Sequence, residues 1–211
     1  MEENDYLHNR HLDNQEIWEL FSNPELVERV ASILGPHLVL WRSNFQLKPP
    51  LSDQKEWNYG WDTSVPWHQD CAYFQPSPNV ILSVWIAVDE VNKDNGCMRV
   101  IPGSHKKLYP HVPNPKYIPG SYFFDKAVDP LIIDEKKAID IELYPGEFFL
   151  FSESILHSSA PNLSERRRFG LTPRITVPFV DIGDRDNLKV LMLKGEDYMG
   201  YYNVINPPNN F

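Results

Sequence analysis

The sequence predicts a mostly β fold, an antiparallel sandwich or barrel, formed by one domain over residues 1–211. Short apolar runs with a period of two recur along the chain, separated by turn signals such as Asn95-Gly96 and Pro145-Gly146. The 19 prolines and the 13% of aromatic residues favour strands, loops and a rigid pocket over a helical bundle. We find no internal repeat and no linker that would divide the chain.

Two helices are predicted before the strands, and we expect them to pack on one sheet. Residues 1–12 are polar, so we expect them to be flexible. The run Asp13-Asn-Gln-Glu16 matches a capping box and predicts a short helix. Asn23-Pro24 supplies an N-cap and a first-turn proline for the second helix, which Gly35-Pro36 stops.

Strands are predicted from residue 38 onward, where the apolar period changes to two. The first is Leu38–Lys48, which ends at Pro49-Pro50. Residues 106–134 are rich in proline and tyrosine without clear periodicity, and we expect a long loop there, functional or mobile. The further predicted strands are Trp67–Ala72, Val80–Val88, Cys97–Ile101, Ile139–Leu143, Phe148–Phe151 and Phe169–Val180.

Charge and composition exclude several classes of protein. A net charge of −9 argues against a protein that follows nucleic-acid phosphates. Two cysteines, Cys71 and Cys97, indicate reduced thiols rather than a disulfide framework. There is no visible secretory signal, and no apolar stretch approaches the ~20 residues of a membrane span. We therefore expect a cytoplasmic protein with no nucleic-acid and no membrane partner; its oligomeric state is left open.

His68 and Asp70 are the most informative residues of the chain. On an extended strand, residues two apart point to the same side, so an imidazole and a carboxylate would converge. His157 follows another apolar, strand-like run and could join them. Two histidines and one carboxylate on one face of a metal form the facial triad of non-haem Fe(II) oxygenases.

Each of these signals has a simpler interpretation. A lone His-x-Asp is more often a polar pair on the solvent face of a strand, and a lone histidine is more often packed or capping. A turn at Pro161-Asn162 would bring the next strand back antiparallel and place Arg168 beside His157. A guanidinium there can hold a carboxylate with two hydrogen bonds. The alternative is a solvated arginine-rich turn, which we accept for Arg166 and Arg167.

Four motifs carry a stronger signal through their order and spacing. The motifs are Trp67-His-Gln-Asp70, Trp85-Ile-Ala-Val-Asp89, Asn95-Gly-Cys-Met-Arg-Val-Ile-Pro-Gly-Ser-His105, and His157-Ser-Ser-Ala-Pro-Asn162 with Ser164 and Arg167-Arg168. Together they resemble the phytanoyl-CoA dioxygenase family of Fe(II)/2-oxoglutarate-dependent oxygenases, and the resemblance runs from about Trp41 to Phe179.

This resemblance implies a double-stranded β-helix (a cupin-like jelly roll), Fe(II), 2-oxoglutarate as co-substrate, and O2. It implies that His68, Asp70 and His157 hold the iron and that Arg168 binds the distal carboxylate of 2-oxoglutarate. Halogenating relatives lack the carboxylate ligand, so Asp70 indicates an oxidation without halogen. Relatives have a longer N-terminal region, so we expect a compact or an incomplete member. The other residues expected around the co-substrate are Ser159, Trp85, Lys48 and Asn44.

We therefore predict a dioxygenase that hydroxylates a C–H bond of a small-molecule metabolite and releases succinate and CO2. No catalytic acid or base beyond the metal ligands is required. Two alternatives stay open: a β-helix protein that binds a metal or ligand without oxidation, and a hydroxylase of protein side chains. The candidate pocket residues, several of which could equally be core or turn residues, are Tyr73, Phe74, Arg42, Arg174, His105, Trp57, Trp61 and the loop Tyr117–Phe124.

Overall fold

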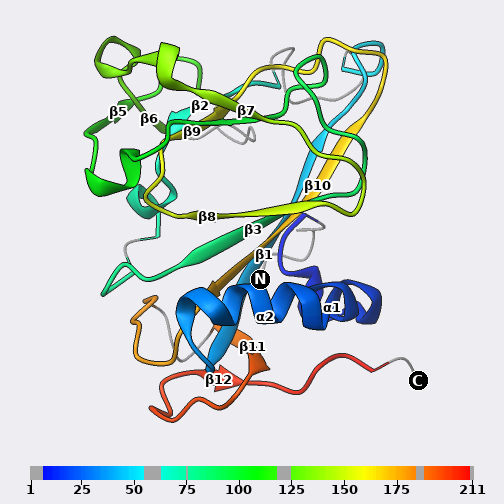
Figure 1. Cartoon of the computed structure of the whole chain (residues 1–211), viewed down its shortest axis with the longest axis vertical. Coiled ribbons are helices and arrows are strands. Elements are labelled where there is room, and N and C mark those ends of the chain that lie inside the picture. The colour runs from blue at the N-terminus through cyan, green and yellow to red at the C-terminus, as the bar shows by residue number, and fades with distance from the viewer. Residues whose placement is uncertain (1–6, 55–62, 75, 118–124, 184–187, 210–211) are drawn as a thin grey trace.

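In the part of the chain that the structure describes, two facing, mostly antiparallel sheets and two α-helices form the main body of the fold (Figure 1). The computed structural model describes residues 7–54, 63–74, 76–117, 125–183 and 188–209. The helices cover the larger sheet on the side away from the smaller sheet. This arrangement confirms the predicted mostly β, double-stranded β-helix fold with helices packed on one sheet.

The larger sheet holds six strands, all antiparallel except for the parallel pair β11–β12. Its order is β12 (Asn203–Val204), β11 (Lys189–Lys194), β1 (Leu38–Lys48), β10 (Arg168–Thr176), β3 (Leu82–Ala87) and β8 (Phe148–Ser152).

The smaller sheet holds four strands, and a separate hairpin lies beside it. The order of the smaller sheet is β2 (Val65–His68), β9 (His157–Ser159), β4 (Met98–Val100) and β7 (Ile139–Ile141). The hairpin pairs β5 (His111–Pro113) with β6 (Lys126–Val128). Part of the predicted loop over residues 106–134 is therefore regular structure.

Both helices begin at asparagine caps. The Asn14 side chain accepts a hydrogen bond from the Ile17 N–H at 2.9 Å and begins α1 (Gln15–Phe21), so Asn14, not Asp13, is the N-cap. In α2 (Pro24–Leu34), the Asn23 cap and the first-turn proline stand as predicted. Among the described residues, no helix combines the length and the apolar character that crossing a bilayer requires.

The larger sheet has one apolar and one polar face because side chains alternate along a strand. Leu171 and Ile175 of β10 pack with Val84 and with Phe21 and Val30 of the helices. The alternate residues of β10 face the smaller sheet, and several carry polar groups. Four of them, Arg168, Gly170, Thr172 and Arg174, are in register with Lys48, Gln46, Asn44 and Arg42 of β1.

Residues 7–12, expected to be flexible, are packed on β1. The Phe45 N–H donates to the Leu7 carbonyl at 2.7 Å, and the Asn9 N–H donates to the Ser43 carbonyl at 2.9 Å. A short 3-10 helix, η1 (Arg10–Leu12), buries His11 completely. The polar composition misled the sequence-based expectation because this segment binds through its backbone and through one buried histidine.

We predict that His11 makes the stability of the protein depend on pH between 6.5 and about 4. Burial lowers the pKa of His11 to about 4, against an opposing effect of Asp13. Between these pH values the unfolded chain binds a proton that the folded chain excludes, so stability falls as the pH decreases. The full decrease in the free energy of unfolding over this range is about 3 kcal/mol.

Urea unfolding at pH 7, 5 and 4 measures this loss. A His11→Gln variant shares every other titrating group, so its stability should fall less over the same range. Equal losses in the variant and the wild type would show that His11 does not cause the dependence.

Candidate metal site

His68 and His157 lie opposite each other on the paired strands β2 and β9. Their ring centroids are 4.0 Å apart. The Nδ1 atom of His68 lies 2.8 Å from the Pro66 carbonyl oxygen, and that of His157 lies 3.0 Å from the Ile155 carbonyl oxygen. Because a carbonyl only accepts, each Nδ1 carries the proton and each Nε2 keeps a lone pair for a metal.

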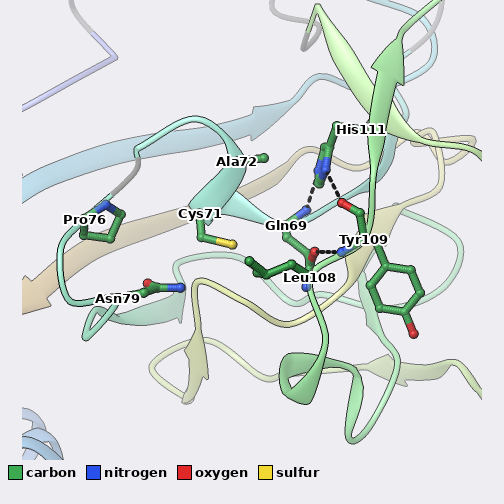
Figure 2. Close-up of a pocket in the computed structure, with 8 residues that line it drawn as sticks. All are labelled: Gln69, Cys71, Ala72, Pro76, Asn79, Leu108, Tyr109 and His111. Carbon is green, nitrogen blue, oxygen red and sulfur yellow. Dashed lines mark hydrogen bonds between the residues drawn. The ribbon is translucent and has the colours of Figure 1, made fainter.

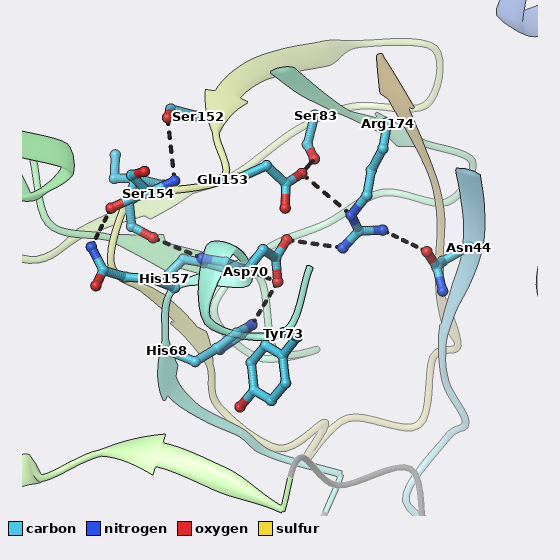
Figure 3. Close-up of polar contacts among 12 residues, drawn as sticks. Asn44, His68, Asp70, Tyr73, Ser83, Ser152, Glu153, Ser154, His157 and Arg174 are labelled. Atoms are coloured by element: carbon cyan, nitrogen blue, oxygen red, sulfur yellow. Dashed lines mark hydrogen bonds and ion pairs between the residues drawn. The ribbon is translucent and has the colours of Figure 1, made fainter. Parts of the chain in front are cut away.

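Asp70 completes a cluster with the two histidines. Its Oδ1 lies 3.2 Å from the His68 Nε2 and 3.8 Å from the His157 Nε2. All three side chains are buried, and their potential ligand atoms lie within 4.8 Å of one another (Figure 3). They form a possible site for a metal ion.

The route by which Asp70 reaches the cluster differs from the prediction. The predicted strand Trp67–Ala72 ends at His68, and Asp70 begins the 3-10 helix η2 (Asp70–Ala72). The convergence therefore comes from this turn and not from two positions on one strand.

The protonation states of the cluster suit metal binding. Burial opposes ionisation of Asp70, but the neighbouring Arg174 guanidinium holds its pKa well below its usual range. Burial, helped by neighbouring His68, lowers the pKa of His157 to about 4. At neutral pH the site therefore presents a carboxylate and a neutral His157 imidazole.

Two ionisable residues, Arg174 and Glu153, extend the site, and the sequence analysis missed both roles. Arg174, a candidate pocket residue, is engaged by Asp70 instead, because its Nη2 donates to Asp70 Oδ2 at 2.9 Å. Glu153 Oε1 lies 3.3 Å from Arg174 Nε and accepts from the Ser83 hydroxyl (Figure 3). Burial and the nearby Asp70 raise the pKa of Glu153 to about 8.

A second group of polar residues lies where β1 and β10 meet. Lys48 and Arg168 are register partners, and both are buried. Lys48 Nζ donates to the Ser159 hydroxyl at 2.7 Å and to the Ala160 carbonyl. Arg168 Nη2 donates to the Gly96 carbonyl at 3.1 Å, and its guanidinium lies 5.3 Å from the Trp85 ring centroid. The structure thus brings four of the five residues expected around a co-substrate together.

Asn44, the fifth, lies nearer to the metal cluster. It is on the same face of β1 as Lys48, and its side-chain oxygen accepts a hydrogen bond from Arg174 (Figure 3).

The predicted turn at Pro161-Asn162 does not place Arg168 beside His157. Strands β9 and β10 belong to different sheets, so the chain crosses from one sheet to the other between them. Buried Asn162 holds this crossing, because its amide donates to the Pro49 carbonyl at 2.9 Å and to the Arg166 carbonyl at 2.7 Å.

Four of the candidate pocket residues, counting Arg174, lie at or beside the cluster. The rings of Tyr73 and His68 have centroids 6.0 Å apart. Phe74 lies next to two guanidinium groups, at 5.0 Å from Arg42 and 5.1 Å from Arg174. Phe74 also makes an edge contact with Trp41.

The other candidates have different positions. His105 is exposed on the 3-10 helix η3 (Ser104–Lys106), where the buried Ser104 hydroxyl accepts from the Leu156 N–H at 2.8 Å. Tyr117 is exposed. Trp57, Trp61 and residues 118–124 lie outside the described residues.

A cavity of about 300 Å³ lies beside the metal-cluster segment (Figure 2). None of His68, Asp70 and His157 lines this cavity, but Gln69, which lies between His68 and Asp70 in the sequence, does. The Gln69 N–H donates to His111 Nε2 at 3.1 Å, and its side chain donates to the Lys107 carbonyl at 2.8 Å. The lining residues are Gln69, Cys71, Ala72, Pro76, Asn79, Leu108, Tyr109 and His111.

A double-stranded β-helix with two histidines and a carboxylate defines a class of candidate metalloenzymes. Residues 2–170 match the family described as phytanoyl-CoA dioxygenase (PhyH). The chain therefore belongs to the phytanoyl-CoA dioxygenase family, as its motifs indicated.

Curated relatives agree with this assignment. The peroxisomal phytanoyl-CoA dioxygenase of Rattus norvegicus is 28% identical over 157 residues, which cover 72% of this chain and 43% of the relative. A probable alpha-ketoglutarate-dependent hypophosphite dioxygenase of Stutzerimonas stutzeri is 29% identical over 200 residues, which cover 89% of this chain and 63% of the relative. The chain spans about half the length of the phytanoyl-CoA dioxygenases that it matches.

Solved structures share the fold. The non-heme monooxygenase ThoJ, in its apo form, superposes with a TM-score of 0.77 at 26% identity, covering 95% of this chain and 69% of that protein. CytC3 with Fe(II) and alpha-ketoglutarate superposes with a TM-score of 0.66 at 24% identity, covering 94% of this chain and 72% of that protein.

We predict that Gly170 is required for the position of the Trp85 ring. A Cβ atom at residue 170 would lie 2.3 Å from Trp85 Cζ2. Gly170→Ala should therefore lower the free energy of unfolding by about 1–3 kcal/mol, the usual cost of overpacking.

The contact itself is tested by a double-mutant cycle in urea unfolding. In a Trp85→Leu background the ring is absent, so adding Gly170→Ala should cost less. An equal cost in both backgrounds would show that the Trp85 ring is not what Gly170 accommodates.

Proposed function

We propose that this chain is an Fe(II)- and 2-oxoglutarate-dependent dioxygenase whose metal is held by His68, Asp70 and His157. The observation that carries the proposal is the convergence of two imidazole nitrogens and one carboxylate oxygen within 4.8 Å. The hydrogen bonds from both Nδ1 atoms to carbonyls support it, because they leave each Nε2 ready to bind a metal. Membership of the family supports it independently.

The donor set fits ferrous iron. Three protein ligands on one face leave the other coordination positions open for the co-substrate and O2. Bound Fe(II) would supply the activation of O2 that is coupled to decarboxylation of 2-oxoglutarate into succinate and CO2. The protein positions the reactants and limits water around them.

In this proposal the group around Arg168 holds the far end of 2-oxoglutarate. Arg168 and Lys48 place two buried positive charges at neighbouring positions, which favours a carboxylate there. Arg168 binds the distal carboxylate, and Ser159 and Trp85 line its site. Asn44 borders the co-substrate between this group and the metal, with its oxygen held by Arg174.

The substrate proposed is a small molecule, hydroxylated at a C–H bond close to the metal. Tyr73 and Phe74 would form one wall because they follow the ligand Asp70 directly and lie near His68 and Arg174. Arg42, in contact with Phe74, would meet an anionic group of the substrate. The cytoplasmic location stays a prediction from the sequence.

Replacing a metal ligand tests the function. His68→Ala or Asp70→Ala should reduce succinate formation from 2-oxoglutarate by more than about 100-fold, above the 10–100-fold typical for the loss of an outer-shell partner. The assay measures O2 uptake and succinate with added Fe(II) during a screen of candidate metabolites. His37→Ala, a partly buried histidine on another part of the chain, serves as control and should keep activity. Unchanged succinate formation in the ligand variants would refute the proposal.

Replacing Arg168 tests the co-substrate site. Arg168→Gln should raise the KM for 2-oxoglutarate by about 10- to 100-fold, because a charge-assisted hydrogen bond contributes about 1.5–3 kcal/mol. The kcat should change less than the KM. Arg166→Gln removes a neighbouring arginine that pairs with Glu90 at the surface, so it should leave the KM unchanged. A similar KM in both variants would contradict the role of Arg168.

A further inference from the structure

Arg174 joins the turn that carries Asp70 to the larger sheet. The guanidinium, on β10, donates through Nη2 to Asp70 and through Nη1 to Asn44 on β1. Its Nε lies 3.3 Å from Glu153, which follows β8 and accepts from Ser83 on β3. Figure 3 shows Arg174 at the centre of these contacts.

The two oxygens of Asp70 have different partners. Oδ2 accepts from Arg174 at 2.9 Å, whereas Oδ1 lies 3.2 Å and 3.8 Å from the Nε2 atoms of His68 and His157. The carboxylate therefore offers one oxygen to the centre of the cluster while the other is engaged by the guanidinium. A carboxylate without such a partner can bind a metal through both oxygens.

Asp70 needs this support more than the histidines do. His68 and His157 are fixed by strand pairing in the smaller sheet, whereas Asp70 lies on a 3-10 helix outside both sheets. The guanidinium is also restrained by the ring of Phe74, whose centroid is 5.1 Å from it. Asp70 and Arg174 are 1% and 6% exposed, so solvent contributes little to either group.

From these contacts we infer that Arg174 is a positioning residue: it fixes Asp70 as a one-oxygen metal ligand and attaches it to the larger sheet. This inference rests on the proposed function, because it takes His68, Asp70 and His157 as the metal ligands. Arg174 itself contacts the ligand and not the metal. Its planar group directs different nitrogens toward Asp70, Asn44 and Glu153, a geometry that the single nitrogen of a lysine does not reproduce.

Titration of the metal-free protein with Co(II) tests this role without any need for turnover. Arg174→Met should raise the Kd for Co(II) by about 10–100-fold, the usual effect of losing an outer-shell partner. The visible absorption of bound Co(II) should also change, because released Asp70 can bind through both oxygens. Arg174→Lys should give a Kd between those of the wild type and Arg174→Met.

Arg99→Met is the matched control. Arg99 also contacts two carboxylates, Glu135 and Asp140, and also lies over an aromatic ring, Trp67. Its replacement should leave the Kd and the absorption spectrum of Co(II) unchanged.

The outcomes separate this inference from the proposed function. If wild-type protein binds no Co(II), the proposed metal site is wrong and the inference falls with it. If wild-type protein binds Co(II) and folded Arg174→Met binds it with the same Kd and spectrum, the role of Arg174 is overturned while the proposed site stands. Should Arg174→Met not fold, a wild-type Kd and spectrum in Arg174→Lys would overturn the role in the same way.

Discussion

The carboxylate of Asp70 connects the two halves of this protein. One of its oxygens lies against two histidines of the smaller sheet, and the other is bound by an arginine of the larger sheet. Asp70 is almost completely buried, so its negative charge depends on these neighbours and not on water. The candidate metal site and a polar contact between the two sheets therefore meet at the same residue.

The polar interior of the larger sheet follows from simple alternation. The outer face of β10 packs Leu171 and Ile175 against the helices, which leaves the alternate positions to face the smaller sheet. Those positions place Arg174 near the metal cluster and Arg168 near Lys48 and Trp85. Strand β10 thus carries both Arg174, which contacts the candidate metal ligand Asp70, and Arg168, the residue proposed to bind the co-substrate.

Much of the fold was predictable because its signals are local. Strand β1 has the predicted bounds Leu38–Lys48, since Gly35-Pro36 and Pro49-Pro50 mark both of its limits. Strand β9, in contrast, consists of His157–Ser159 and has no apolar alternation to identify it. Strands β11 and β12 were also missed, and the hairpin β5–β6 lay inside a segment without clear period.

The site was predictable as a set of residue types but not as a geometry. The motifs pointed to the three residues of the cluster, but only the folded chain shows that Asp70 reaches it from a turn. Arg174 could have been placed on the face of Arg168, because it lies six positions further along and the predicted strand Phe169–Val180 begins directly after Arg168. Nothing in the sequence indicated that Glu153 would be its second acidic partner.

The most direct measurement is a crystal structure of the protein with Mn(II) and 2-oxoglutarate, with the metal located by anomalous scattering. This account predicts one metal peak bonded to the Nε2 atoms of residues 68 and 157 and to a single oxygen of residue 70, with the distal carboxylate of the keto acid on Arg168. A metal bound elsewhere, or one that leaves these three side chains uncoordinated, would contradict it.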